Sequence, residues 1–361
     1  MNKFDMSFYK GKRVLITGHT GFKGSWMSQM LLMQGCDVYG YALKNEDSKS
    51  LYNLSGTSKD IHSFYADIRD LNALKNAFDI AKPEIVIHMA AQPLVRKSYE
   101  EPVYTFETNV MGTVNVLECI RKCDSVTSFV NVTTDKVYKN FETNRAYKED
   151  DILCGFDPYS NSKSCSELVT DSYTNSFFGK DSDRKCAISR MRAGNVIGGG
   201  DFAKNRIIPD CVRAALSGED IIIRNPDSIR PYQFVLEPIY AYLFTAAMQY
   251  RDKKYAGTYN VGPLESDHKT TKELVELFCN KWNKDDLHNK INYICKNDNG
   301  PKEAELLKLS TKKIQDTFGL FPHMDIEKTM DFIIEFADVY SKKGNIAACM
   351  KKQITEFLKL C

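Results

Sequence analysis

The stretch Thr17-Gly-His-Thr-Gly-Phe-Lys-Gly24 decides the fold that we predict for this chain. Its glycines, Gly18, Gly21 and Gly24, recur every three residues between a short apolar run and the start of a helical pattern. Glycine permits positive φ and lets a phosphate approach the backbone, and the free N–H groups at a helix N-terminus favour an anion. In this context of strand, turn and helix, the stretch predicts a nucleotide-binding turn rather than a purely structural one.

The residues on either side of this turn predict a parallel sheet covered by helices. Residues 14–17 form a short buried strand, residues 22–34 a helical pattern ended by Gly35, and residues 36–41 the next strand. Further β-rich runs, each after a helical stretch of ten residues or more, lie at 61–66, 84–90, 128–132 and 185–191. This alternation is typical of the α/β class, with a doubly wound parallel Rossmann-type sheet.

The pattern changes near residue 198, where glycines and prolines begin to separate shorter elements. We therefore expect residues 1–192 to form a NAD-binding Rossmann domain, to which a segment near 233–260 returns. Residues 193–232 and 261–361 would form a smaller mixed α/β domain for the substrate. The last forty residues predict two helices separated near Gly344.

Composition excludes several classes of protein. Among the 361 residues, 49 Lys+Arg against 47 Asp+Glu give a net charge of +2, which offers little support for nucleic-acid binding. A hydrophobic share of 43% is that of a globular chain. Without 18 consecutive apolar residues or an apolar leader in residues 1–12, we expect a cytoplasmic protein with no membrane contact. Eleven cysteines without C-x-x-C predict reduced thiols and no metal site.

The nature of the dinucleotide depends on the residues after the second and third strands. The second strand ends in Tyr41-Ala42-Leu43-Lys44, without the acidic residue that often holds an adenosine ribose. Because only Lys44 is there to meet a 2′-phosphate, we expect NAD rather than NADP. Asp67 and Ile68 are candidate adenine contacts, or they belong to the cap of the next helix around Asp70.

Two further stretches could carry chemistry. Residues 131–138, Asn-Val-Thr-Thr-Asp-Lys-Val-Tyr, begin as a strand and end polar at the carboxyl edge of the sheet, where such folds bind ligands. Tyr159 and Lys163 lie four apart on a helix that Asp157 and Pro158 begin, so phenol and ammonium share one face. A neighbouring cation would lower the pKa of the tyrosine and make it a better base.

At these residues the chain resembles the extended short-chain dehydrogenase/reductase family, through TGHTGFKG, the sheet-edge TTD and YSNSK. Five blocks narrow the resemblance to the dehydratases of that family that act on CDP-glucose: HTGFKGSW (19–26), HMAAQPLVRKSY (88–99), TTDKVY (133–138), RAGNVIGGGDF (192–202) and RPYQFVLEPI (230–239). The resemblance implies a lyase that converts CDP-glucose to CDP-4-keto-6-deoxyglucose with a recycled NAD+.

The resemblance also implies roles for individual residues. Tyr159 would take the proton of the C4 hydroxyl, with Thr134 bonded to the C4 oxygen and Lys163 holding the nicotinamide ribose. Asp135 would protonate the departing C6 hydroxyl. Lys136 stands where dehydratases of dTDP-glucose and GDP-mannose carry Glu, and it would remove the C5 proton or, alternatively, only pair with Asp135.

By the same resemblance, the ligand contacts form two groups. The cofactor contacts are Gly18, His19, Gly21, Phe22, Lys23, Gly24, Asp67, Ile68, Ala90, Ala91, Gln92, Tyr159 and Lys163. The substrate contacts are Asn195, Arg206 and Arg230 at the diphosphate and Arg96 near the active site. A homodimer formed through residues 103–122 and 157–178 and a part in deoxysugar synthesis for a bacterial surface glycan, such as a lipopolysaccharide O-antigen, are implied as well.

Three other functions remain open at this stage. A sugar-nucleotide 4-epimerase shares the turn and the Tyr/Lys pair but has no need of Asp135 and Lys136. A protein that only senses the cofactor could lose Tyr159 and Lys163 without penalty. A dehydratase for another nucleotide sugar fits the same residues, because Tyr232, Phe234 and Ser310 depart from the expected family pattern and leave the choice of base open.

Overall fold

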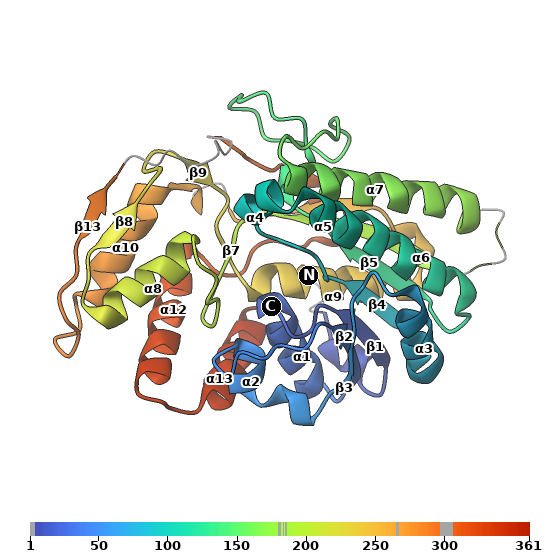
Figure 1. Ribbon diagram of the computed structural model, residues 1–361, viewed down its shortest axis with the longest axis horizontal. Helices are drawn as coiled ribbons and strands as arrows, with labels where there is room; N and C mark the ends of the chain where they lie inside the picture. The colour runs from blue at the N-terminus through green and yellow to red at the C-terminus, as the bar shows by residue number, and fades with distance from the viewer. Residues whose placement is uncertain (1–3, 180–181, 183, 185, 265–266, 297–305) are drawn as a thin grey trace.

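The computed structural model describes residues 4–179, 182, 184, 186–264, 267–296 and 306–361. Seven parallel strands form the central sheet in the order β11-β6-β5-β4-β1-β2-β3 (Figure 1). Their bounds are β1 Arg13–Thr17, β2 Asp37–Ala42, β3 His62–Tyr65, β4 Ile85–His88, β5 Ser128–Val132, β6 Ala187–Ala193 and β11 Thr258–Val261. The predicted doubly wound α/β sheet is confirmed; residue 185, where the sixth strand was expected to begin, lies outside the described residues.

Helices bury both faces of the sheet. Successive residues of a strand point to opposite faces, so each strand contributes side chains to two cores. Val14 and Ile16 of β1 pack into the core of one face, and Leu15 between them packs into the core of the other. The first face is covered by α1 (Phe22–Met33), α9 (Leu236–Arg251) and α13 (Ile346–Leu360), and the second by α3 (Leu71–Ala81), α6 (Gly112–Lys122) and α7 (Pro158–Phe177) (Figure 1).

The helix expected over residues 103–122 is interrupted. A short helix α5 (Pro102–Phe106) runs into a π-helical turn, η3 (Glu107–Met111), before α6 begins. Single π-helical turns of this kind interrupt α-helices and often lie beside functional sites. Here the turn carries Asn109, which is buried against the loop after β4.

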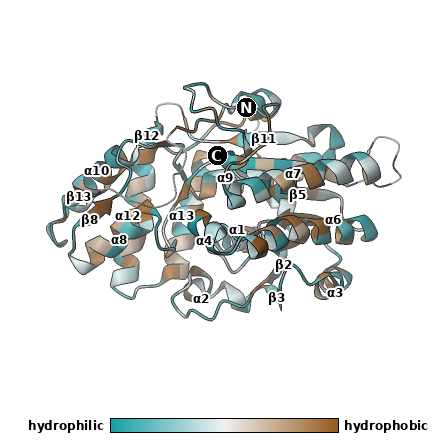
Figure 2. Cartoon of the chain, turned by 45° about the horizontal axis from the view of Figure 1, so that its top comes forward, coloured by the Kyte–Doolittle hydropathy of each residue, from teal (hydrophilic) through white to brown (hydrophobic). Residues whose placement is uncertain are grey.

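The region beyond residue 198 forms a smaller mixed α/β lobe with its own core. Its helices are α8 (Ile207–Ser217), α10 (Thr271–Trp282) and α12 (Ile326–Ser341), and its short strands are β7 (Val196–Ile197), β8 (Ile221–Ile223), β9 (Ile229–Arg230), β10 (Gln233–Phe234), β12 (Lys269–Thr270) and β13 (Tyr293–Cys295). Helix α11 (Lys312–Phe318) packs instead on β11 of the central sheet. Apolar residues of α8, α10 and α12 share one buried cluster. No helix in the described ranges is both long and apolar enough to cross a membrane, and hydrophobic and hydrophilic residues alternate along them (Figure 2).

The two predicted C-terminal helices are confirmed as α12 and α13, on either side of Gly344. They lie in different places: α12 packs on α10 in the smaller lobe, whereas α13 packs on α1 beneath the sheet. The sheet also gains β11 from the segment expected to return near 233–260. The division of the chain into 1–192 with 233–260 and 193–232 with 261–361 remains a proposal, with α13 lying on the cofactor side.

Candidate active site

The glycine turn between β1 and α1 leaves no room for side chains. Gly18 has φ of +81°, and its N–H donates to the Tyr41 carbonyl at 2.8 Å. A Cβ on Gly18 would lie 2.9 Å from the Ala90 nitrogen, and one on Gly24 would lie 2.2 Å from the Gly18 carbonyl oxygen. Gly21 immediately precedes α1, so the free N–H groups of the helix lie at the turn. Bare backbone and a helix N-terminus together suit a pyrophosphate.

His19, within this turn, lies against the sheet rather than in solvent. It is fully buried, its Nε2 lies 3.1 Å from Ser63 Oγ, and its ring packs edge-on against Tyr52. Burial lowers the pKa of His19 to about 4, so the imidazole is neutral at physiological pH. His19 therefore anchors the turn to β2 and β3.

Ala90, Ala91 and Gln92 follow β4 beside the turn, as the cofactor contacts require. The Gln92 N–H donates to Asn109 Oδ1 at 2.8 Å, and Asn109 Nδ2 donates to Ser162 Oγ of α7 at 2.8 Å. The loop after β4 is thus tied through the π-turn to the helix that carries the predicted tyrosine and lysine.

Thr134, Asp135 and Tyr159 meet where β5 ends. Their exposed fractions are 6%, 1% and 9%. Thr134 Oγ1 donates to Asp135 Oδ1 at 2.9 Å, and Thr134 lies close enough to the Tyr159 hydroxyl to oppose the rise in its pKa. Asp135 Oδ2 has no hydrogen-bond partner within the described part of the chain. Burial raises the pKa of Asp135, and burial also raises the pKa of Tyr159 to about 12.

Lys163 lies one helical turn beyond Tyr159, but its ammonium points to the sheet. Its Nζ donates to the Val132 carbonyl at 3.1 Å, and burial lowers the pKa of Lys163 to about 8, opposed by the charge of Glu167. The lowering of the tyrosine pKa by Lys163, expected from their spacing, is not what the structure shows. Burial dominates, and the hydrogen bond with Thr134 opposes it only in part.

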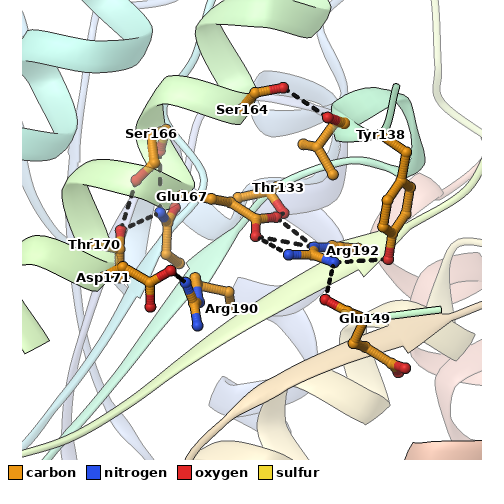
Figure 3. A network of polar contacts seen from close by, with 12 residues as sticks. Thr133, Tyr138, Glu149, Ser164, Ser166, Glu167, Thr170, Asp171, Arg190 and Arg192 are labelled. Carbon is orange, nitrogen blue, oxygen red and sulfur yellow. Dashed lines mark hydrogen bonds and ion pairs between the residues drawn. The ribbon is translucent and has the colours of Figure 1, made fainter. Parts of the chain in front are cut away.

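A buried ion pair between Glu167 of α7 and Arg192 of β6 supports these residues (Figure 3). Arg192 Nε donates to the two carboxylate oxygens at 2.8 and 2.9 Å, and Thr133 Oγ1 donates to Glu167 Oε1 at 2.6 Å. Thr133 precedes Thr134, and Glu167 lies one turn after Lys163. The pair therefore fixes the end of β5 against α7, a role that the sequence motifs did not predict.

Two further groups lie near the predicted catalytic residues. Lys23, expected as part of the turn, holds its Nζ 5.7 Å from the ring centre of Tyr242 on α9. Burial lowers the pKa of Lys23 to about 7, and the charge of Lys163 acts in the same direction. The fully buried Tyr242 hydroxyl has no hydrogen-bond partner among the residues described, and after burial the charges of Tyr159 and Asp135 raise its pKa further. No spacing in the sequence signals Tyr242.

Two of the predicted substrate contacts lie within electrostatic reach of Asp135 and Tyr159. Burial raises the pKa of Asp135, and the charge of the buried Arg230 opposes this rise. Burial raises the pKa of Tyr159, and the charge of Arg206, which also pairs with Asp201 at 2.8 Å, opposes that rise. Asn195 is half-buried before β7, and Arg96 is half-buried on α4 (Val95–Glu100), which packs against α7.

The residues that follow the third strand have different contacts in the structure. Asp70 caps α3, whereas Asp67 pairs with Arg69 at 2.8 Å. Ile68 is buried beneath α6, where a Cβ on Gly112 would lie 2.8 Å from it. The capping role thus falls to Asp70, and adenine contacts from Asp67 and Ile68 remain a prediction.

Lys136 lies half-buried in a short 3-10 turn, η4 (Asp135–Val137). Its charge opposes the burial that raises the pKa of Asp135, which places the ammonium near that carboxyl. This proximity suits both roles that the sequence leaves open for Lys136, the C5 base and the partner of Asp135.

The glycine turn, the parallel sheet and the Tyr/Lys pair of α7 define an enzyme of the extended short-chain dehydrogenase/reductase class. Residues 15–332 match the model of the GDP-mannose 4,6 dehydratase family, and the chain belongs to that family. It is 41% identical over 357 residues to the CDP-glucose 4,6-dehydratase of Salmonella typhimurium, covering 98% of each chain. It is 28% identical over 275 residues to the dTDP-D-glucose 4,6-dehydratase of Dictyostelium discoideum, covering 72% of this chain and 60% of that one.

Solved structures share the fold. A dTDP-glucose 4,6-dehydratase from Bacillus anthracis in complex with NAD has a TM-score of 0.75 at 19% identity, covering 92% of this chain and 99% of the other. A UDP-glucose 4-epimerase from Thermus thermophilus, also a complex with NAD, has a TM-score of 0.74 at 24% identity, covering 90% and 99%. Because dehydratase and epimerase match almost equally, the fold does not choose between these reactions.

Proposed function

We propose that this protein is a NAD-dependent lyase that dehydrates CDP-glucose to CDP-4-keto-6-deoxyglucose. The observation that carries the proposal is the contact of Thr134 with both Asp135 and Tyr159 at the end of β5. Oxidation at C4 needs only the tyrosine and the cofactor, whereas loss of water from C5 and C6 also needs an acid beside them. The 41% identity to a CDP-glucose 4,6-dehydratase along nearly the whole chain supports the same substrate.

The turn fits NAD, because added side chains at Gly18 and Gly24 would collide with the backbone of Ala90 and of Gly18, so only glycines let the turn close at the N-terminus of α1, where a pyrophosphate would bind. Lys44, the cation expected to meet a 2′-phosphate, pairs instead with Glu46 at 3.1 Å, which favours NAD over NADP. Bound NAD+ would accept hydride from C4 and later return it to C6. We assign its remaining contacts to His19, Gly21, Phe22, Lys23, Asp67, Ile68, Ala90, Ala91, Gln92, Tyr159 and Lys163.

The side chains of the site divide the remaining work. Tyr159 takes the C4 hydroxyl proton as the ketone forms, and Thr134 lies beside it. The ketone makes the C5 hydrogen more acidic, and we assign its removal to Lys136. Asp135 protonates the C6 hydroxyl, the C6–O bond breaks, and water leaves. The raised pKa of Asp135, caused by its burial, suits a carboxyl that must hold a proton until this step.

We place the substrate diphosphate between the two lobes, on Arg230, Asn195 and Arg206, with Arg96 nearby. One guanidinium group can donate to two phosphate oxygens at once. The charge of Arg230 acts on Asp135 and that of Arg206 acts on Tyr159, so both arginines lie near the proposed catalytic residues. The smaller lobe would then bind the sugar nucleotide and the sheet domain would bind NAD.

Assembly and location are also proposals. Large apolar side chains are exposed on α5, η3 and α7, namely Val103, Met111 and Leu168, which supports a homodimer through these helices. All eleven cysteines are free thiols, as expected in the cytoplasm. The product would be consumed by enzymes that build deoxysugars for a surface glycan such as an O-antigen.

The test is incubation of the purified protein and NAD+ with CDP-, UDP-, dTDP- and GDP-hexoses, followed by mass spectrometry. We expect CDP-glucose to lose one water. Loss of water from another nucleotide sugar would correct the substrate alone. An epimer of unchanged mass would contradict the dehydratase function, and NAD binding without any reaction would indicate a sensor.

A further inference from the structure

Tyr138 lies in the middle of a buried row of hydrogen bonds. On one side, Arg192 Nη1 donates to its hydroxyl at 2.7 Å, and Arg192 is paired with Glu167, which accepts from Thr133 Oγ1 at 2.6 Å (Figure 3). On the other side, the Tyr138 hydroxyl donates to Asn260 Oδ1 at 2.6 Å. The five side chains are at most 4% exposed, so the row lies in the interior, where an unpaired polar group is costly.

Asn260 joins this row to residues 306–310, which we call the connecting segment. Asn260 Nδ2 donates to the Tyr147 carbonyl at 2.9 Å and to the Ser310 carbonyl at 3.2 Å. Backbone hydrogen bonds hold the same two stretches together, from Tyr147 N to the Lys308 carbonyl at 2.9 Å and from Ser310 N to the Tyr147 carbonyl at 2.8 Å. The connecting segment is therefore fixed at one end by the amide of Asn260.

The connecting segment also packs on the residues that follow the proposed acid and base. Leu307 and Leu309 are buried in one small core with Val137 and Tyr138. Val137 is the last residue of η4, the turn that holds the acid and the base. The ring of Tyr147 stacks on that of Tyr138, with 5.2 Å between the ring centres. Tyr138 thus meets the connecting segment through both its hydroxyl and its ring.

The other end of the connecting segment lies beside the strand of a predicted diphosphate ligand. Leu306 forms a parallel bridge with Ile229, the first residue of β9, and the second residue of β9 is Arg230. Arg230 is 5% exposed. The connecting segment therefore runs from the neighbour of Arg230 to the turn that holds Asp135 and Lys136.

We propose that Tyr138 is a positioning residue that makes the placement of the proposed acid and base depend on the substrate diphosphate. A diphosphate held by Arg230 fixes β9, and the connecting segment passes this constraint to η4. The Tyr138 hydroxyl ties η4 to the segment through Asn260 and to the end of β5 through Arg192. Binding energy from the nucleotide, which is remote from the reacting carbons, then serves the chemical steps as well as the binding of substrate.

The inference rests on the proposed function, and a double-mutant cycle in the steady-state dehydration of CDP-glucose tests it. Tyr138→Phe removes the hydroxyl that joins the two halves of the row and keeps the ring. Arg230→Gln removes the guanidinium proposed to hold the diphosphate. We expect each substitution alone to lower kcat about tenfold, because the acid and the base lose their position. Arg230→Gln should also raise KM about tenfold, whereas Tyr138→Phe should leave KM within about twofold.

The double variant decides between a coupled and a merely structural role. If Arg230 acts on the chemistry through Tyr138, the double variant should lose about tenfold in kcat, as each single variant does. Two independent losses would instead multiply to about 100-fold, and that result overturns the inference. A wild-type kcat for Tyr138→Phe would overturn it as well.

Tyr9→Phe is the matched control, because the Tyr9 hydroxyl is also fully buried and donates to the Leu243 carbonyl at 2.6 Å. It should leave kcat unchanged, with or without Arg230→Gln. A loss of kcat equal to that of Tyr138→Phe would contradict a specific role for Tyr138.

A second variant tests the same connection if Tyr138→Phe does not fold. Leu307→Ala loosens the packing of the connecting segment and keeps the hydrogen-bonded row. It should lower kcat, and Arg230→Gln should then lower kcat no further; a multiplied loss overturns the inference. Wild-type affinity for NAD, measured by isothermal titration calorimetry, shows that each variant is folded. Failure of the wild type to dehydrate CDP-glucose overturns the proposed function itself, so the two failures are distinguishable.

Discussion

The imidazole of His19 rests directly on Gly40 of β2: a Cβ at Gly40 would lie 2.3 Å from the ring. This contact holds the nucleotide-binding turn against the sheet at the strand where an acidic ribose ligand is absent. Since no side chain fits between ring and strand, the position of the turn depends on a glycine outside the turn itself.

We therefore expect Gly40→Ala to displace His19 and weaken NAD binding about tenfold or more, measured by isothermal titration calorimetry. Gly257→Ala is the matched control, because its Cβ would meet nothing closer than 3.5 Å. Equal affinity of both variants for NAD would show that the contact does not position the turn.

Glu167→Gln should destabilise the fold by about 3–5 kcal/mol, because it leaves Arg192 charged and unpaired in the core. The free energy of unfolding in urea measures this. Asp171→Asn makes the same chemical change on the same helix in the more exposed pair with Arg190, where the cost should stay below about 1 kcal/mol. Similar costs for the two variants would mean that the buried pair is not a structural anchor.

Acid should destabilise the protein through two buried histidines. Burial lowers the pKa of His19 to about 4 and of His88 to about 3. The unfolded chain therefore binds more protons between pH 6.5 and 4, and stability falls as pH falls through that window, by about 1.4 kcal/mol per pH unit for each histidine. His88→Asn should remove about that much of the slope in unfolding measured at several pH values. A slope that the substitution does not change would refute this account.

Lys136→Met separates the two roles of Lys136. If Lys136 removes the C5 proton, CDP-glucose is oxidised at C4 and then stalls, so NADH accumulates in rapid-scanning absorbance. Lys139→Met removes the same charge from an exposed neighbour and should turn over normally. If Lys136→Met slows turnover without any NADH, Lys136 serves only as the partner of Asp135.

Local sequence patterns were enough to predict the sheet, the start of α7 and the polar residues that follow β5. Short continuous apolar runs and the glycine turn lie in neighbouring residues, so they predict β1, α1 and β2. Asp157 and Pro158 likewise predict the start of α7. Thr134 to Lys136 were placed correctly because strand ends of a parallel sheet share one edge.

What the sequence did not predict depends on contacts between distant segments. Tyr242 reaches Lys23 only because α9 packs against both α1 and the sheet. Lys163 and Tyr159 share a helix face as their spacing requires, yet the Val132 carbonyl from another element sets where the ammonium points. A spacing fixes which residues are neighbours on a helix, whereas burial and tertiary partners fix their charge.

The most direct test of the central claim uses CDP-glucose carrying deuterium at C4. The account predicts a product that is lighter by one water and carries the deuterium at C6, shown by mass spectrometry and proton NMR, because the hydride taken from C4 returns to C6 of the same sugar. Deuterium retained at C4 of an epimer, or a 6-deoxy product without deuterium, would contradict an internal dehydration at this site.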